Sequence, residues 1–216
     1  MPLYKTINFS PSTQILVWEI TESFQELFRE VQLNEKSLLR LNNMKSELHQ
    51  RGFLSVRKLL QEAGYNDFDL HYDESGKPHL NPNSRHTEPV EVSITHSFHF
   101  SAIIISDQKA GIDIEMQREK IIRIVDKFVD YEFNFLKPEK IQEYIRKLTV
   151  IWGVKESIFK IRNEKGISFK DHIKVTAFEM SENQGRAWLH FDNVVEDFNI
   201  HFEEIENFTL VYAFEN

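Results

Sequence analysis

Apolar residues recur at helical spacing in two separate stretches of the chain. The first runs from about residue 34 to residue 63, and its apolar positions are Leu38, Leu41, Leu48, Phe53, Val56 and Leu60. The second runs from about residue 139 to residue 162, with an apolar stripe formed by Leu148, Ile151, Val154, Ile158 and Ile161. These patterns predict two long helices, each with one side to bury.

Apolar and polar residues alternate in two other stretches. Between residues 90 and 115, a two-residue period with short breaks predicts three adjacent strands. Residues 173–214 hold three or four short alternations around turns near residues 182–185 and 206–207. The order is helix then strands, twice. It indicates an α+β protein in which two halves each pack a long helix on a small antiparallel sheet. We place the halves at residues 1–106 and 107–216, although no sequence repeat relates them.

The composition is that of an ordinary soluble protein. Of the 216 residues, 41% are hydrophobic and 28% are charged, which fits neither a disordered nor a fibrous chain. Asp and Glu total 34 against 26 Lys and Arg, a net charge of −8, so no overall basic field favours nucleic acid. The longest aliphatic run, residues 102–105, is far too short to span a bilayer, and the first residues show no signal-peptide pattern. We expect a cytoplasmic protein that binds neither nucleic acid nor membrane.

Two acidic residues alternate with isoleucine in residues 111–115. The period of a strand sends Ile112 and Ile114 to one face, and Asp113 and Glu115 to the other. Like charges side by side disfavour each other's ionised form, so the pair is either well solvated or holds a cation. Because the chain has no Cys, thiolate zinc sites are excluded. Oxygen ligands alone favour Mg²⁺, with Mn²⁺ as the other candidate.

The second predicted helix supplies a third carboxylate. Trp152, Glu156 and Lys160 are four residues apart, so they line up on a side turned away from the apolar stripe. In one interpretation Glu156 and Lys160 form an ordinary helical ion pair, and Trp152 belongs to the core. In the other, the helix presents a carboxylate and an ammonium group at a functional site. This segment alone does not decide between the two.

A histidine and a lysine stand where predicted strands meet turns. His96 lies at the end of a strand, among hydroxyl groups that can anchor a phosphate or orient the imidazole. A lone histidine is more often structural. Gly76, Lys77 and Pro78 are typical of a turn, where a lysine is usually a surface residue. His99 follows His96 at a distance of three residues, but no third ligand is near, so we expect no histidine metal site.

Taken together, these segments resemble the 4′-phosphopantetheinyl transferase superfamily, specifically its Sfp-like class of double-domain length. The resemblance covers about residues 45–168 and rests on the order and spacing of short motifs. They are Gly76-Lys77-Pro78, Ser93-Ile94-Thr95-His96-Ser97, Gly111-Ile112-Asp113-Ile114-Glu115, Phe128 with Glu132, and Trp-x-x-Lys-Glu-Ser-x-x-Lys from Trp152 to Lys160.

The resemblance implies an enzyme that transfers the phosphopantetheine arm of coenzyme A to a serine of an apo acyl or peptidyl carrier protein, releasing adenosine 3′,5′-bisphosphate. It also implies a pseudo-twofold fold with the active site in the cleft between the halves. Two fused halves remove the need for self-association, so we expect a monomer. Carrier proteins are typically acidic. Docking candidates are therefore the basic positions of the first predicted helix and Lys120, Arg123 and Lys127.

Carried over residue by residue, the resemblance implies a site drawn from several segments. Asp113, Glu115 and Glu156 resemble the Mg²⁺ ligands. Lys155 and Lys160 resemble partners of the coenzyme A phosphates and of the charge that develops during transfer. The residues that resemble the coenzyme A site at its nucleotide end are Lys77, Pro78, Thr95 and His96, with Arg51 or Arg57 assisting. The serine hydroxyl needs a base, for which the candidates are Glu156, Glu132 and a metal-bound water.

Two other functions fit parts of the same pattern. One is a non-catalytic coenzyme A or carrier-protein binding module on this scaffold. Loss of a metal ligand would favour it, but all three carboxylates and both lysines are present. The other is a Mg²⁺-dependent phosphohydrolase on an unrelated fold, which would release free phosphate and need no carrier protein.

Overall fold

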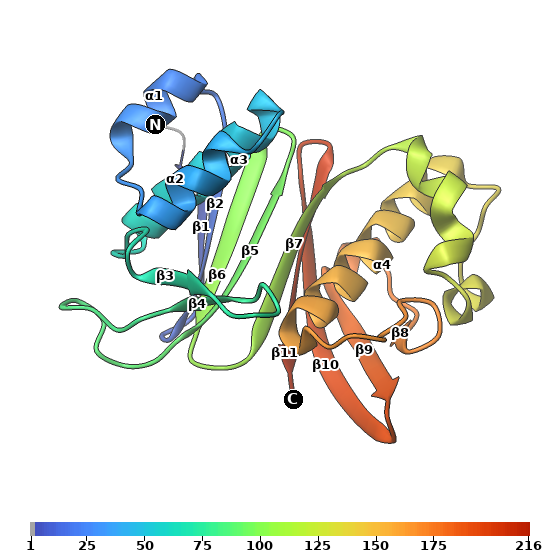
Figure 1. Ribbon diagram of the computed structural model, residues 1–216. Helices are drawn as coiled ribbons and strands as arrows, with labels where there is room; N and C mark the ends of the chain where they lie inside the picture. The colour runs from blue at the N-terminus through green and yellow to red at the C-terminus, as the bar shows by residue number, and fades with distance from the viewer. Residues whose placement is uncertain (1–2) are drawn as a thin grey trace. The chain divides into compact units, whose positions relative to one another are not determined.

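The computed structural model describes residues 3–216, which form helices and antiparallel sheets (Figure 1). The chain divides into two compact units, Met1–Gln108 and Lys109–Asn216. The α+β class predicted from the sequence is confirmed. Across the described residues, none of the helices combines the length and the apolar character that a membrane crossing needs.

The first unit is an antiparallel sheet with helices packed on it. Over the described residues, four strands pair in the order β1-β2-β6-β5, and β3 pairs with β4 in a separate hairpin. The elements are β1 (Leu3–Ser10), β2 (Thr13–Glu19), α1 (Phe24–Glu30), α2 (Glu35–Asn42), α3 (Glu47–Glu62), β3 (Leu70–Tyr72), β4 (Pro78–Leu80), β5 (Glu91–Ser97) and β6 (Phe100–Ser106). α3 buries Phe53, Val56 and Leu60 in one core with Leu16 and Ile103 of the sheet.

The helix predicted over residues 34–63 is two helices, so this prediction is wrong. α2 ends at Asn42 and α3 begins at Glu47, with Ser46 as its N-cap residue. Consecutive asparagines at the break have low helix propensity and favour helix ends. The apolar spacing continues across the break only by coincidence, since Leu38 and Leu48 are exposed.

Two further features of the sheets differ from the pattern in the sequence. Residues 3–30 form β1, β2 and α1, none of which the pattern predicts. β1 is a half-exposed edge strand, and β2 carries a continuous apolar run instead of an alternation. The third of the strands predicted between residues 90 and 115 is β7, which pairs with β11 of the second unit and belongs to a different sheet from β5 and β6.

The second unit packs one long helix, α4 (Ile141–Arg162), on an antiparallel sheet. Within the described residues, five strands pair in the order β7-β11-β10-β9-β8. They are β7 (Ala110–Met116), β8 (Ile173–Val175), β9 (Gln184–Phe191), β10 (Val194–Ile205) and β11 (Phe208–Glu215). Short 3-10 helices complete the unit: η1 (Glu119–Lys127), η2 (Tyr131–Asn134) and η3 (Met180–Glu182). The predicted second helix and the strands after it are confirmed.

α4 comes very close to the sheet at two glycines. A Cβ atom on Gly111 would overlap the backbone carbonyl of Ser157. A Cβ atom on Gly153 would lie 2.6 Å from Cγ2 of Val211 and 3.7 Å from Oδ2 of Asp113. The lack of a side chain at both positions lets α4 lie directly on β7 and β11. This contact brings one flank of α4 beside the acidic face of β7.

We expect Gly111→Ala to destabilise the protein by about 1–3 kcal/mol, because the added methyl group meets backbone that cannot rotate away. Urea denaturation measures the change. Gly185→Ala in β9 is the matched control, since its new Cβ would face the flexible end of Ile200 at 3.3 Å. Equal losses in the two variants would contradict the close helix-sheet approach as the cause.

Candidate active site

The two acidic residues of β7 point toward α4. Ile112 and Ile114 are fully buried on one face of the strand, as the alternation predicts. Asp113 lies on the other face, is only 5% exposed, and has its carboxylate beside Gly153 of α4. Glu115, two residues on, is half-buried. The acidic face is therefore not a solvated surface, because the helix covers most of Asp113.

Glu156 on α4 shares the electrostatic environment of this acidic face. Its pKa is raised from an ordinary value of 4.5 to about 7. Burial is the largest cause, and the negative charge of Asp113 is the next. Lys160 acts in the opposite direction, and Glu115 adds to the rise. The two carboxylates of β7 therefore act on Glu156, which is about 40 residues away in the sequence.

Lys160 connects α4 to β7. Its ammonium group lies 2.9 Å from Oδ1 of Asp113 and donates a hydrogen bond of 2.8 Å to the carbonyl of Ile112. Its closest contacts thus reach across to the strand instead of along the helix to Glu156. Lys160 is about one-quarter exposed, so a positive charge is accessible beside the carboxylates.

The donor set at this place fits a hard divalent cation in its chemistry. All three side chains offer carboxylate oxygens, and their mutual repulsion would be relieved by a positive charge. Among residues 3–216, no three His, Asp or Glu side chains are gathered closely enough to bind a metal ion as they stand. The expectation that Asp113, Glu115 and Glu156 grip a single ion therefore stays a prediction.

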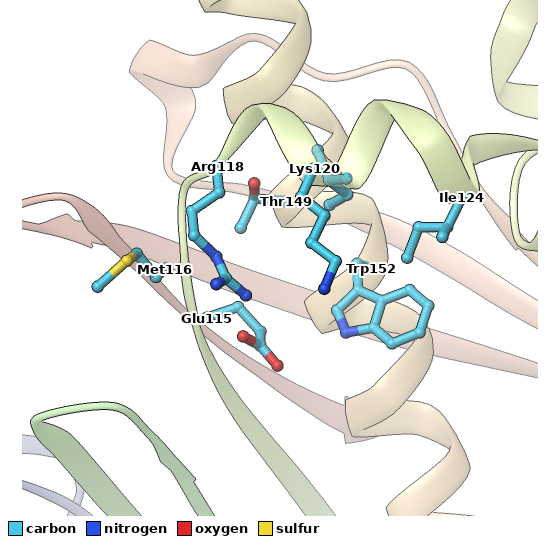
Figure 2. Close-up of a pocket in the computed structure, with 8 residues that line it drawn as sticks. Glu115, Met116, Arg118, Lys120, Ile124, Thr149 and Trp152 are labelled. Carbon is cyan, nitrogen blue, oxygen red and sulfur yellow. The ribbon is translucent and has the colours of Figure 1, made fainter.

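A cavity of about 200 Å³ lies next to Glu115 (Figure 2). Its lining comes from the end of β7, from η1 and from α4: Glu115, Met116, Arg118, Lys120, Ile121, Ile124, Thr149 and Trp152. In Figure 2 the side chains of Arg118 and Lys120 extend toward Glu115 and Trp152. The cavity is mostly apolar, with acidic and basic groups at its edge, and this arrangement suits a neutral chain attached to a charged group.

Trp152 forms a wall of this cavity and is held in place by aromatic neighbours. Its ring makes edge contacts with Phe128 and Phe169, with centroids 5.2 Å and 5.6 Å apart. The interpretation of Trp152 as part of the core is confirmed, and its role at a functional site stays a prediction. The ring packs against the core of the second unit, and it also faces the cavity.

Lys155 and Glu132 form a fully buried ion pair. Both side chains are 0% exposed, and the Lys155 ammonium lies 2.8 Å from Oε1 of Glu132. The ammonium also donates hydrogen bonds of 2.6 Å to the Phe128 carbonyl and 2.9 Å to the Phe169 carbonyl. Glu132 accepts the backbone N–H of Val175 at 2.9 Å. Burial lowers the pKa of Lys155, and Glu132 opposes that effect.

These buried contacts do not fit the roles that the resemblance implies, which are a phosphate partner for Lys155 and a base for Glu132. Lys155 lies next to Val154, on a side of α4 that the chain around Phe128 and Phe169 covers. The charge of Lys155 therefore does not reach the surface. A group without solvent access does not contact a phosphate or take a proton from a substrate hydroxyl. We therefore assign Lys155 and Glu132 to holding these two segments on α4.

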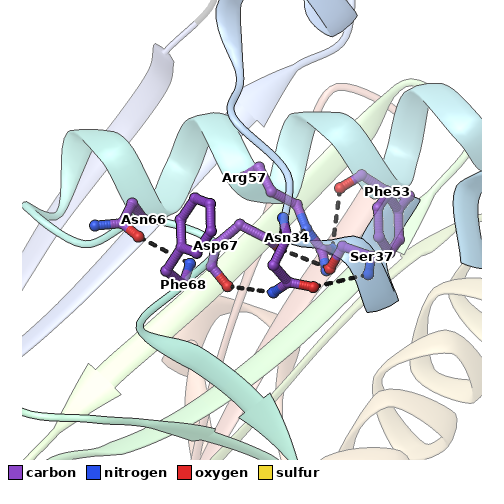
Figure 3. Close-up of polar contacts among 7 residues, drawn as sticks. All are labelled: Asn34, Ser37, Phe53, Arg57, Asn66, Asp67 and Phe68. Atoms are coloured by element: carbon purple, nitrogen blue, oxygen red, sulfur yellow. Dashed lines mark hydrogen bonds and ion pairs between the residues drawn. The ribbon is translucent and has the colours of Figure 1, made fainter. Parts of the chain in front are cut away.

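Arg57 is buried in the first unit, in a network that the sequence does not predict (Figure 3). Its Nε donates a 2.9 Å hydrogen bond to Oδ1 of Asp67, and both side chains are almost fully buried. Asp67 also accepts the hydroxyl of Ser37 at 2.9 Å and the backbone N–H of Asn34 at 2.8 Å. The guanidinium stacks over Phe53. Arg57 therefore ties α2 and the Asp67 turn to α3 and does not present its charge to a ligand.

The other expected coenzyme A residues of the first unit lie on α3, in β5 and at the start of β4. Arg51 is half-buried and donates a 2.9 Å hydrogen bond to the Ile20 carbonyl. Lys77 precedes Pro78, the first residue of β4. Thr95 is buried in β5.

His96 is exposed near the end of β5, and its ring packs on Gly52 of α3. The ring of His49, also on α3, lies 6.3 Å away between centroids. His96 thus sits at an accessible edge of the first unit, where the resemblance places a nucleotide.

The sequence interpretation missed most residues of the cavity. Met116 ends the acidic strand, Arg118 follows it, and Thr149 lies on α4, one turn before Trp152. Ile121 and Ile124 belong to η1, whose apolar residues recur at the three-residue spacing of a 3-10 helix. That spacing, directly after the acidic strand, is the sequence pattern from which the η1 side of the cavity could have been predicted. Asp67, the buried partner of Arg57, has no comparable signal, since nothing in a single sequence pairs residues ten positions apart.

A protein family matches the unit that carries the carboxylates. Residues 109–213 match the 4′-phosphopantetheinyl transferase superfamily. The chain is also similar to the 4′-phosphopantetheinyl transferase gsp of Aneurinibacillus migulanus, with 26% identity over 134 residues. That alignment covers 62% of this chain and 52% of the relative, so the chain spans about half the length of the curated relative it matches. The family match contains the carboxylates, Lys160 and the whole cavity lining.

Proposed function

Because this chain belongs to the 4′-phosphopantetheinyl transferase superfamily through residues 109–213, we propose that it is a Mg²⁺-dependent enzyme of carrier-protein modification. It transfers the 4′-phosphopantetheine group from coenzyme A to a serine of an apo acyl or peptidyl carrier protein and releases adenosine 3′,5′-bisphosphate. The observation that carries the proposal is the group of three interacting carboxylates, Asp113, Glu115 and Glu156, beside an apolar cavity.

The carboxylates would hold the cation, with Mn²⁺ as a substitute for Mg²⁺. When bound, the ion supplies positive charge to the pyrophosphate oxygens during displacement at phosphorus. Lys160 places a second, fixed positive charge beside Asp113. Negative charge grows on the phosphate oxygens in the transition state, so this ammonium stabilises the transition state more than the ground state.

The serine proton needs a base, and we propose for it Glu156, if the bound cation leaves that side chain uncoordinated, or a water bound to the cation. Without a cation the pKa of Glu156 is about 7, and direct coordination to a divalent cation would lower it. Glu132, the other side chain considered for this role, is fully buried against Lys155. Burial therefore removes Glu132 from this role, and Glu156 and the bound water remain the two candidates.

The cavity beside Glu115 has the character needed for the pantetheine arm, which is extended and uncharged. Trp152, Ile121 and Ile124 offer apolar walls to such an arm. Arg118 and Lys120 at the edge give a local positive charge on a chain whose net charge is −8. An acidic carrier protein would be attracted to that edge. We further propose that the first unit contributes Lys77 and His96 at the nucleotide end and that the enzyme acts as a monomer.

The test is to incubate the purified chain with coenzyme A, Mg²⁺ and several apo carrier proteins, then to weigh each carrier by mass spectrometry. We expect a mass gain of one phosphopantetheine group, which is lost when the carrier serine is replaced by alanine or when the metal is chelated. Binding of coenzyme A with no mass gain on any carrier would support a non-catalytic binding module. Free phosphate released without a carrier would support a phosphohydrolase.

A further inference from the structure

The turn between β3 and β4 is built around one carboxylate, that of Asp73. Its Oδ1 accepts the backbone N–H of Ser75 at 2.9 Å, the hydroxyl of Ser75 at 2.6 Å and the backbone N–H of Lys77 at 2.9 Å. The backbone of Asp73 also pairs with that of Lys77, with its N–H donating to the Lys77 carbonyl at 3.1 Å. The side chain of Asp73 thus holds both Ser75 and Lys77 in the turn.

The other oxygen of Asp73 fixes the strand that follows. Oδ2 lies 3.1 Å from Nε2 of His79 in β4. The His79 ring stacks on that of His71, its direct partner in β3, with centroids 5.4 Å apart. Gly76 takes a φ of 85°, which favours glycine and lets the chain reverse toward Lys77. Asp73 therefore holds the positions on both sides of Lys77.

The hydrogen bonds keep this carboxylate charged. The hydroxyl of Ser75 is the largest cause, followed by His79 and the backbone N–H groups, and together they hold the pKa of Asp73 well below its usual range. An ionised oxygen makes stronger hydrogen bonds than a neutral one. The turn is therefore fixed although most of its residues are exposed.

We infer that Asp73 is a positioning residue, which holds the backbone at Lys77 so that the Lys77 ammonium meets the phosphate end of coenzyme A. The inference rests on the proposed function, since the ligand of Lys77 is coenzyme A only if the chain is the transferase. Without the hydrogen bonds of Asp73, a turn of exposed residues would sample many conformations. The backbone position of Lys77 would then no longer be fixed. The Lys77 ammonium lies 3.6 Å from Oε2 of Glu91, the first residue of the edge strand β5, and His96 lies near the other end of that strand.

The test compares Asp73→Ala, Asp73→Asn and Lys77→Ala in the carrier-modification assay. We expect Asp73→Ala to raise the KM for coenzyme A about tenfold with little change in kcat, because the loss falls on ground-state binding. Asp73→Asn should give a KM between those of the parent and Asp73→Ala, since an amide oxygen accepts the same backbone hydrogen bonds but carries no charge. Glu74→Ala, an exposed neighbour in the same turn, is the control and should leave KM unchanged.

A double variant separates positioning from general stability. If Asp73 acts through Lys77, then Asp73→Ala combined with Lys77→Ala will raise the KM no further than Lys77→Ala alone. Additive effects would overturn the inference, as would a parental KM in Asp73→Ala. Failure of the parent chain to modify any carrier would instead overturn the proposed function. In that case, amide hydrogen exchange at Ser75 and Lys77 still tests whether Asp73 fixes the turn. Equal protection of these amides in Asp73→Ala and in the parent would overturn the inference.

Discussion

Glu156→Gln will make the metal-free protein more stable at pH 8 and will abolish transfer. The folded-state pKa of Glu156 is about 7, above its ordinary value of 4.5, so the folded chain binds this proton more tightly than the unfolded chain does. The stabilising contribution of the proton is complete below about pH 4.5 and is lost as the pH rises through 7. At pH 8 the ionised carboxylate costs about 2 kcal/mol, allowing for its partial solvent access. A neutral glutamine removes that cost.

Urea denaturation at pH 5 and pH 8, in the presence of a chelator, measures this effect. We expect the variant and the parent to differ much less at pH 5, where Glu156 is protonated in the folded parent. Glu143→Gln is a matched control on the same helix. Hydrogen bonding to Lys147 lowers the pKa of Glu143, so its replacement should bring no gain at pH 8. If Glu156→Gln is no more stable than the parent at pH 8, burial and the neighbouring carboxylates do not disfavour the ionised form of Glu156 as described.

Mg²⁺ gives the same variant a second readout. A cation held by Asp113, Glu115 and Glu156 binds the folded chain only, so it should raise the melting temperature of the parent. The rise should be absent or much smaller in Glu156→Gln, because one ligand charge is gone. Glu156 would thus hold a cation while its charge destabilises the metal-free fold. Such a residue is typical of an active site, where the needs of function oppose those of stability.

The parts of this site that the sequence predicts are those fixed by local periodicity. The two-residue period of β7 places Asp113 and Glu115 on one face, and the helical period of α4 aligns Glu156 with Lys160. Both statements hold because a strand or a helix determines where consecutive side chains point. The strands of the tail, β8 to β11, are predicted for the same reason.

The parts that the sequence does not predict depend on what covers each element. Periodicity places Lys155 at the border of the apolar stripe, but whether that border is open depends on the chain around Phe128 and Phe169. Arg57 lies on a helix whose basic positions look like a solvated surface, yet Asp67 folds over it. In both cases a tertiary partner decides whether a charge is available for chemistry or used inside the fold.

Lys155→Met will destabilise the protein by about 3–5 kcal/mol, because it leaves the Glu132 carboxylate buried without its counter-charge. Domains of this size are typically stable by about 5–15 kcal/mol, so the variant should lose a large share of that stability and unfold at a much lower urea concentration. Lys140→Met, at the exposed start of the same helix, removes a lysine paired with Glu143 at the surface and should cost less than about 1 kcal/mol.

The paired variant separates a structural role from a catalytic one. Replacing Lys155 with Met and Glu132 with Gln together removes both charges, so the double variant should recover much of the stability that Lys155→Met loses. It should also recover transfer, since neither charge reaches the surface in the folded protein. A double variant that folds like the parent and modifies no carrier would show that Lys155 or Glu132 takes part in catalysis. Circular dichroism in urea and the carrier mass assay, run on the same preparations, distinguish the two results.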